Sequence, residues 1–167
     1  MFLSRPREYY KYSYLEALKE YQAEGLYLKY DIDELRNDFA AFIVELRERE
    51  DSKYTGRVPE TILWLIDEGE YIGRISIRHS LNERLLKYGG NIGYDIRPSK
   101  RQAGYGCSIL RLGLMKARIL GLSQILLTCS SDNLASKKII EKNGGVFESC
   151  IWSEEDNTSI LRYWFYM

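Results

Sequence analysis

Apolar residues recur at helical spacing twice within the first fifty positions. The first stretch predicts a helix over residues 6–25, with Pro6 in its first turn and Gly25 at its end. The second predicts one continuous helix over residues 33–50, with a stripe of leucine, isoleucine and phenylalanine side chains on one face. Residues 2–4 are expected to form a short strand before these helices. The beginning of the chain is therefore mainly helical.

Short β-prone runs follow in the middle of the chain. Residues 61–66 and 71–77 are two such runs joined by a polar turn, which is typical of a β-hairpin. Residues 81–88 form a mixed polar and apolar connection that is long enough for one helical turn. Residues 91–97 predict a third strand, which Pro98 ends because proline cannot donate a hydrogen bond to a sheet.

Helical and strand patterns alternate in the last third. Residues 104–120 and 133–143 predict two helices, and residues 124–129 between them predict a strand of the kind that is buried on both faces. Residues 146–152 and 160–167 predict two final strands joined by a polar turn. This order of strands and helices predicts a mixed α/β (α+β) fold.

Length and composition narrow the class of protein. The 167 residues suit one domain over residues 1–167, and 24 basic residues balance 24 acidic ones, which argues against a dedicated nucleic-acid binder. The three cysteines, Cys107, Cys129 and Cys150, fit neither a disulfide framework nor a metal site, so we expect reduced thiols. The sequence has no apolar run of about 18 residues and no signal-peptide pattern. We therefore expect a cytoplasmic protein without a membrane span or a metal.

The segment from Asp95 to Gly106 carries the clearest chemical signal. A strand ends there, a basic turn with glycines follows, and a helix begins, so unpaired N–H groups and the helix dipole favour an anion. Gly104 and Gly106 are expected to let a phosphate approach without a side-chain clash. Residues 96–131 contain no Asp or Glu and six Lys or Arg residues. We infer a local anion site in a neutral protein.

Two common phosphate motifs do not fit this segment. The Walker pattern requires a lysine after the last glycine, but Cys107 follows Gly106. The dinucleotide pattern requires a third glycine, where Ile109 stands, and an acidic residue about 20 positions later, which is absent. An unrelated nucleotide-binding α/β protein is therefore the weakest of the functional alternatives.

The segment instead resembles the pyrophosphate-binding signature of the GNAT superfamily, which is Gln/Arg-x-x-Gly-x-Gly/Ala. The sequence from Arg101 to Gly106 reads Arg-Gln-Ala-Gly-Tyr-Gly. The sequence from Asn133 to Gly144 resembles a later helix of the same superfamily, Asn-x-x-Ser/Ala followed by Glu-Lys-x-Gly. The resemblance, to a bacterial-type predicted acetyltransferase, extends from about Tyr9 to the end. It implies a central, mixed, mostly antiparallel twisted sheet flanked by helices.

The resemblance also implies acetyl-CoA as cosubstrate. Backbone amides of residues 102–106 would hold the pyrophosphate, the strand near Ile96 would pair with the pantetheine arm, and Asn133 and Ser136 would contact its thiol end. Lys137 or Lys142 would reach the 3′-phosphate, or simply cover a solvated helix face. The implied cofactor-binding residues are Ile96, Arg97, Arg101, Gln102, Ala103, Gly104, Tyr105, Gly106, Asn133 and Ser136.

Acetyl transfer to an amine needs a base and an oxyanion donor. A lysine-like amine has a pKa near ~10.4, so it must lose a proton before it attacks. His79, Glu83 and Asp95 are the candidate bases, and each is also explained by a structural role. Many GNAT members carry an acidic Tyr where this chain has Ile140. Ser136 or a Tyr from elsewhere would then protonate the leaving thiolate, or it would leave unassisted.

The sequence thus predicts an N-acetyltransferase that moves acetyl from acetyl-CoA to a primary amine of a small molecule or peptide. The alternative is a non-catalytic acyl-CoA-binding or sensing module on the same fold. Acidic residues at the start of the second helix are expected to border a site for a cationic amine: Asp31, Asp33, Glu34 and Asp38. The aromatic final strand is either core or the edge of a homodimer.

Overall fold

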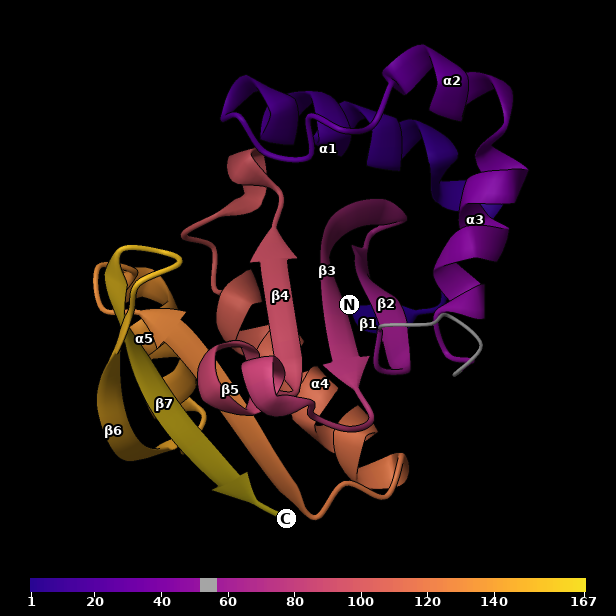
Figure 1. Cartoon of the computed structure of the whole chain (residues 1–167). Coiled ribbons are helices and arrows are strands. Elements are labelled where there is room, and N and C mark those ends of the chain that lie inside the picture. The colour runs from indigo at the N-terminus through magenta and orange to yellow at the C-terminus, as the bar shows by residue number, and fades with distance from the viewer. Residues whose placement is uncertain (52–56) are drawn as a thin grey trace.

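Strands form two antiparallel sheets with helices on both sides in the computed structural model, which describes residues 1–51 and 57–167 (Figure 1). In chain order the elements are β1 (Phe2–Ser4), the 3₁₀ turn η1 (Glu8–Tyr10), α1 (Lys11–Ala23), α2 (Ile32–Asn37), α3 (Phe39–Glu48), β2 (Glu60–Asp67), β3 (Glu70–Arg78), the π-helical turn η2 (Leu85–Gly89), β4 (Ile92–Ile96), the 3₁₀ turn η3 (Pro98–Lys100), α4 (Tyr105–Ile119), β5 (Gln124–Ser130), α5 (Leu134–Lys142), β6 (Val146–Ser153) and β7 (Thr158–Tyr166). The predicted mixed α/β, mostly antiparallel architecture is confirmed.

The first sheet has the strand order β1-β2-β3-β4. Its centre is the predicted hairpin of β2 and β3, which places Trp64 opposite Arg74, and β4 pairs antiparallel with β3. Side chains alternate between the two faces of such a sheet. One face of β2 and β3 therefore carries Trp64, Arg74 and their neighbours, and the other carries Leu63, Leu65 and Ile75.

The second sheet has the order β5-β7-β6, and hydrogen bonds between Asn91 and Leu126 join it to the first. The Asn91 N–H donates to the Leu126 carbonyl oxygen (2.7 Å), and the Leu126 N–H donates to Asn91 Oδ1 (2.9 Å). Gly90 makes this approach feasible, because a Cβ there would lie 2.5 Å from the Leu126 oxygen. Beyond this junction β4 and β5 diverge (Figure 1).

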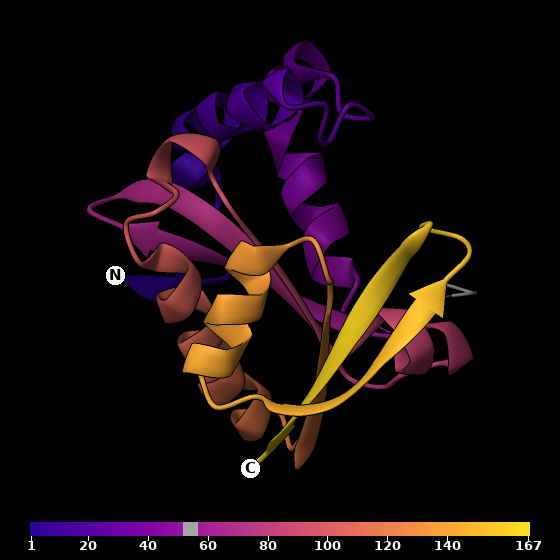
Figure 2. The same ribbon diagram turned by 90° about the vertical axis from the view of Figure 1, so that its left-hand side faces the viewer.

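Two hydrophobic clusters cover the two faces of the first sheet. The helices α4 and α5 lie on one face, as Figure 2 shows, and their cluster includes Ile75, Ile109 and Ile140. The helices α1 and α3 pack on the other face around Trp64, whose indole stacks on the Tyr14 ring with centroids 4.8 Å apart. Many tyrosines of the N-terminal third are therefore packing residues.

The prediction of one continuous helix over residues 33–50 is wrong. The backbone leaves the helical region at Asp38 (φ −130°, ψ 61°), which separates α2 from α3. Asp38 Oδ1 accepts the Ala41 N–H (3.1 Å), and Asp31 caps α2 in the same way. The apolar stripe continued through the break, but an aspartate favours a cap over a helix interior because its side chain competes for backbone donors.

The reading of the final strand as the edge of a dimer is also wrong. The strand β7 pairs with β5 on one side and with β6 on the other, so it is the centre of its sheet. Its residues Tyr163 and Phe165 are buried in the cluster beneath α4 and α5. In the described ranges no helix is both long enough and apolar enough to cross a membrane.

Candidate functional site

The start of α4 presents free backbone donors. Its N-cap residue, Gly104, adopts a left-handed conformation (φ 83°), and no side chain caps the helix there. In contrast, aspartate or asparagine side chains cap α2, α3 and α5. The N–H groups of a first helical turn lack intrahelical partners and carry the positive end of the helix dipole. Tyr105 and the residues after it therefore offer a cradle that fits a phosphate group.

The two glycines of this loop have different roles. A Cβ on Gly104 would meet nothing within 4 Å, so this glycine is needed for its positive φ and leaves its surroundings open. A Cβ on Gly106 would lie 2.4 Å from Cδ1 of Ile139. Gly106 therefore lets α4 approach α5.

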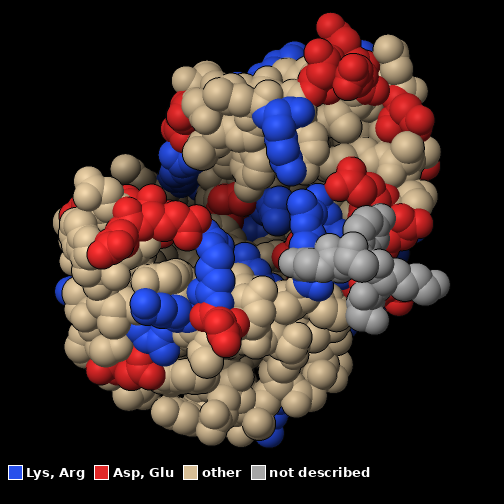
Figure 3. Space-filling view, in the orientation of Figure 1, with Lys and Arg blue, Asp and Glu red and all other residues tan. Residues whose placement is uncertain are grey.

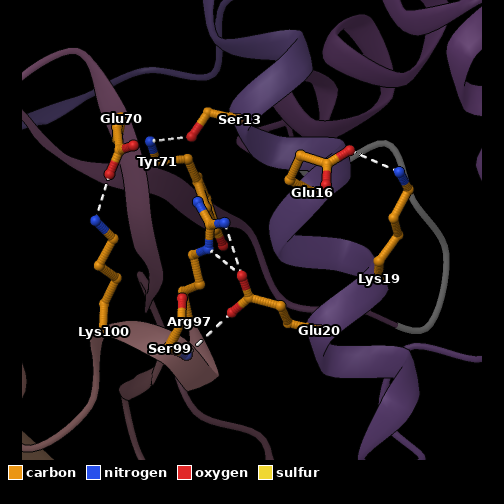
Figure 4. Close-up of polar contacts among 9 residues, drawn as sticks. All are labelled: Ser13, Glu16, Lys19, Glu20, Glu70, Tyr71, Arg97, Ser99 and Lys100. Carbon is orange, nitrogen blue, oxygen red and sulfur yellow. Dashed lines mark hydrogen bonds and ion pairs between the residues drawn. The ribbon is translucent and has the colours of Figure 1, made fainter.

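The basic side chains of the loop pair with carboxylates of α1 and β3. Arg97 bonds to Glu20 (2.7 Å), whose second oxygen accepts the Ser99 N–H (3.0 Å), and Lys100 pairs with Glu70 (Figure 4). Desolvation raises the pKa of Glu20, but the hydrogen bonds from Arg97 and Ser99 outweigh it, so the pKa is lowered.

Arg101 follows the same pattern. Its guanidinium forms a two-pronged ion pair with Glu24 (2.8 and 2.9 Å), and its Nε donates to the Ile96 carbonyl oxygen (3.1 Å). The loop is thus held against α1 by side chains, and backbone N–H groups remain to receive an anion.

The strand β4 has one open edge. The Arg97 N–H donates to Ile72 O (2.8 Å) and Asn91 O accepts the Arg78 N–H (2.7 Å), so these two residues bond toward β3. Alternate residues of an antiparallel ladder bond to the same side. Tyr94 and Ile96 therefore direct their N–H and C=O groups away from β3, into the region where β5 diverges.

Two hydroxyl groups meet across this region. Tyr94 Oη lies 3.1 Å from Ser136 Oγ, which joins β4 to the first turn of α5. Asn133 Oδ1 accepts the Ser136 N–H (2.9 Å) and so caps α5. Ile140 is fully buried in the core. The hydroxyl groups of Tyr94 and Ser136 therefore link β4 to the start of α5.

Asp95 points to the opposite face of β4, toward α1. Its Oδ1 accepts the Tyr21 hydroxyl (2.7 Å), its Oδ2 accepts the Tyr27 hydroxyl, and Arg74 Nε lies 4.0 Å away. Burial raises the pKa of Tyr21 and Tyr27, and the Asp95 charge raises it further. Tyr27 also has a positive φ (54°), which is strained for a bulky residue. Both oxygens of Asp95 are already hydrogen-bonded.

The other two candidate bases lie apart from Asp95. His79 directly follows β3, at the end that pairs with the beginning of β4. Ile96 lies at the other end of β4. His79 Nε2 lies 2.8 Å from Thr61 Oγ1. Glu83 is exposed in the connection before η2. Of the three candidates, Asp95 shares a strand with the open edge.

An open acidic groove of about 430 Å³ lies between α2 and α3. Figure 3 shows acidic side chains gathered over α2, while Lys and Arg side chains gather in the central hollow of this face. The groove is lined by Lys29, Tyr30, Asp31, Glu34, Leu35, Asp38, Ala41, Phe42 and Glu45. Asp33 lies outside this lining and pairs with Arg36 (2.5 Å). Three of the four predicted acidic residues thus border one concave surface.

The contacts of Tyr94, Tyr21 and Tyr27 were missed by sequence reasoning. They join residues 42, 74 and 68 positions apart, and no local pattern marks such pairs. The one available signal was alternation in β4, which places Tyr94 and Asp95 on opposite faces. Among residues 1–51 and 57–167, no group of His, Cys, Asp and Glu side chains is arranged to hold a metal ion.

The sequence was compared with protein-family models and with curated proteins. A family model described as acetyltransferase (GNAT) domain matches residues 6–146. A search of curated proteins finds none that matches the sequence.

Solved structures match the whole fold. A RimL ribosomal L7/L12 alpha-N-protein acetyltransferase in complex with Coenzyme A is 19% identical, with 99% of this chain and 93% of that chain covered and a TM-score of 0.68. The microcin C7 self-immunity acetyltransferase MccE, with acetyl-CoA and AMP, is 15% identical, with 99% and 91% covered and a TM-score of 0.71. A spermidine N-acetyltransferase SpeG chimera from Vibrio cholerae and hSSAT is 16% identical, with 99% and 96% covered and a TM-score of 0.65. At these identities the likeness shows a shared fold.

Proposed function

Because the chain belongs to the GNAT acetyltransferase family, we propose that it transfers an acetyl group from acetyl-CoA to a primary amine. The observation that carries this proposal is the uncapped start of α4 beside the open edge of β4. Free N–H groups there suit a pyrophosphate, and a strand edge suits the amide groups of a pantetheine arm. Two acetyltransferases of the same fold, RimL and MccE, have structures in complex with CoA and acetyl-CoA, respectively.

In this proposal the backbone carries most of the cofactor contacts. The N–H groups of residues 102–106 bind the pyrophosphate, and the outward N–H and C=O groups of Tyr94 bind the pantetheine. Asn133 and Ser136 lie at the thiol end. Arg97 and Arg101 act by fixing the loop on α1, since Glu20 and Glu24 already neutralise their charges.

Acetyl-CoA supplies an acetyl thioester, and the chain supplies the groups around it. The Ile96 N–H, on the open edge of β4, serves as the oxyanion donor. Asp95 serves as the base, through a water molecule, because its strand borders the same edge. His79 and Glu83 remain the alternative bases. Replacing Asp95 with Asn should then lower kcat by about 10² or more with the protein still folded.

For the acceptor we propose a cationic amine, carried by a small molecule or peptide. The acidic groove between α2 and α3 supports this, because four carboxylates and one lysine give it a net negative charge: Asp31, Glu34, Asp38, Glu45 and Lys29. Substitution of Glu34 and Glu45 by Gln should raise the KM for polyamines and leave that for neutral amines unchanged. An unchanged KM for every amine would rule out the groove.

Thermal-shift titration with acetyl-CoA, CoA, ATP and NAD tests the cofactor directly. A ligand at 100 times its Kd adds about 2.7 kcal/mol of stability. We expect the melting temperature to rise with the two CoA species and to stay unchanged with ATP and NAD. No rise with either CoA species would overturn the proposal.

The variant Gly104→Asp places a carboxylate where the pyrophosphate is expected. It should weaken CoA binding by at least tenfold. Gly121→Asp is the matched control, because Gly121 ends α4 with nearly the same φ (85° against 83°) and equally open surroundings. If both variants bind CoA equally well, the loop does not hold the pyrophosphate.

A non-catalytic acyl-CoA-binding module is the second candidate. It is favoured because the chain has Ile140 where many GNAT members carry an acidic tyrosine. Turnover with a panel of amines separates the two candidates, because a sensor would bind acetyl-CoA and release no free CoA in the presence of any amine.

A further inference from the structure

A hollow with basic side chains lies over β3 and β4, on the face of the first sheet opposite to α4. Side chains of a strand alternate between the two faces of a sheet. Because Ile75 and Ile77 point into the cluster under α4 and α5, Arg74 and Arg78 lie on the other face. In Figure 1 α4 lies behind these strands, so Figure 3, in the same orientation, looks onto the face of the two arginines. The basic hollow of Figure 3 thus overlies the part of the sheet that carries them.

Arg78 forms no ion pair with any of the described residues. Its Nη1 donates to the carbonyl oxygens of Gly89 (3.2 Å) and Gly90 (2.9 Å), which carry no net charge. Burial lowers the pKa of Arg78; Glu60 raises it in part, and the positive charge of Arg74 lowers it again. The partly buried charge of Arg78 therefore lacks a neighbouring anion and makes the hollow attractive to one.

Arg74 has unused hydrogen-bond donors. Its Nε lies 4.0 Å from Asp95 Oδ2, at the outer limit of an ion pair, while the two oxygens of Asp95 accept the hydroxyl groups of Tyr21 and Tyr27. Its guanidinium carbon lies 5.9 Å from the centre of the Tyr27 ring, and the guanidinium makes no hydrogen bond to a described residue. A guanidinium presents five N–H donors in a planar fork that matches the two oxygens of a carboxylate. With its side chain 21% exposed, Arg74 can bind an anion from the hollow.

Resting on the proposed function, we propose that the acceptor is an α-amino acid and that Arg74 binds its carboxylate, while the charge of Arg78 raises the affinity of the hollow for that anion. Arg74 and Asp95 are partners in the register of β3 and β4. In an α-amino acid a single carbon separates the amine from the carboxylate. A carboxylate bound to Arg74 thus places the amine beside Asp95, which is the base in the proposed function.

The acidic groove and the two arginines bind different parts of such an acceptor. The groove between α2 and α3 suits a cationic side chain, whereas the arginines lie on β3. The Tyr27 ring joins the two places, because it contacts Arg74 on one side and stacks on Tyr30 of the groove on the other, with ring centroids 6.3 Å apart. A basic amino acid therefore suits both places, and a diamine suits only the groove.

Isothermal titration of the full chain saturated with CoA tests this proposal without turnover. Lysine and cadaverine differ only in the α-carboxylate, as do ornithine and putrescine. Each amino acid should bind the unchanged protein about tenfold more tightly than its diamine, because the diamine cannot form the charge-assisted hydrogen bonds to Arg74. In Arg74→Gln the two members of each pair should bind equally. Arg74→Lys, which keeps the charge and loses the planar fork, should keep part of the difference.

Arg118→Gln is the matched control. It removes the same charge from an exposed position of α4, on the opposite face of the sheet, and should leave the preference for the amino acids unchanged. If neither amino acid binds the unchanged protein more tightly than its diamine, or if Arg118→Gln abolishes the preference as Arg74→Gln does, the role of Arg74 is overturned while CoA binding stands. If the unchanged protein fails to bind CoA, the proposed function itself fails.

Discussion

Gly106 has no side chain, and this lets α4 approach α5 closely. The site at the start of α4 depends on this contact, because α5 carries Ser136 and α4 carries the free N–H groups. A Cβ would lie 2.4 Å from Cδ1 of Ile139, which is closer than atoms in a packed core can approach. Gly106 is thus a packing residue between α4 and α5.

Gly106→Ala should therefore lower the free energy of unfolding by about 1–3 kcal/mol, the usual cost of overpacking. The melting temperature should fall by about 2–4 °C per kcal/mol. Ile139→Val removes the clashing Cδ1 atom, so Gly106→Ala should lower the free energy of unfolding much less when Ile139 is replaced by valine. Equal costs in the two backgrounds, measured by urea denaturation, would contradict this contact.

Glu148 is a second residue whose environment can be tested. Hydrogen bonds from Arg162 and Trp164 lower its pKa to about 2. Because the pKa is lowered on folding, the stabilisation is present above the ordinary value of 4.5 and is lost as the pH falls toward 2. The Glu148 side chain is 37% exposed, so solvent screening limits its contribution to about 1 kcal/mol.

Glu148→Gln should thus be less stable than the unchanged protein at pH 6 and closer to it at pH 3. Urea denaturation at both values gives the comparison. Glu154→Gln, at an exposed glutamate in the adjoining turn, is the control and should show the same small difference at both pH values. If the difference in stability between Glu148→Gln and the unchanged protein were the same at pH 6 and pH 3, an ion pair between Glu148 and Arg162 would be excluded.

At the scale of elements, the break between α2 and α3 shapes the acidic groove. Asp38 ends one helix and caps the next, and both helices supply carboxylates to the groove. A continuous helix would carry residues 31–45 along one straight axis of about 20 Å. The bend at Asp38 instead turns α3 down along the sheet, as Figure 1 shows.

Asp38→Ala should cost about 1 kcal/mol, because the Ala41 N–H loses its acceptor. Asp33→Ala is the matched control, since Asp33 is an exposed residue whose ion pair with Arg36 is worth little. Thermal unfolding of the two variants tests the difference. Equal melting temperatures would show that Asp38 does not stabilise α3.

At the scale of the whole molecule, Asp95 ties the N-terminal helices to the sheet. It accepts hydrogen bonds from Tyr21 in α1 and from Tyr27 in the loop after it, and its Oδ2 lies 4.0 Å from Arg74 Nε. Removing such a charge leaves a partly buried guanidinium without its counter-ion. Asp95 thus fixes α1 and the loop after it on β4.

Asp95→Asn should lower the free energy of unfolding by about 1.5–3 kcal/mol, the range for hydrogen bonds to charged groups. Hydrogen exchange should also quicken in residues 24–31 before it does elsewhere. Tyr21→Phe should produce part of this change, whereas Tyr12→Phe, which removes an exposed hydroxyl from the same helix, should produce none. Unchanged exchange in Asp95→Asn would exclude the structural tie.

Local patterns alone determined the order of elements and indicated the loop that we propose to bind an anion. Periodicity, turn residues and the position of Gly104 are short-range signals, and they predicted nearly every strand and helix, because a few neighbouring residues set backbone conformation. They failed at Asp38, where a cap overrode an apolar stripe.

The tertiary structure decided which side chains meet. Folding paired Arg101 with Glu24, placed Gly106 against Ile139, and joined Tyr94 to Ser136 across 42 residues. Such contacts depend on how helices pack on a twisted sheet, and no spacing along the chain encodes them. The loop proposed to bind the cofactor was therefore visible in the sequence, whereas the contact between Tyr94 and Ser136 became visible only in the fold.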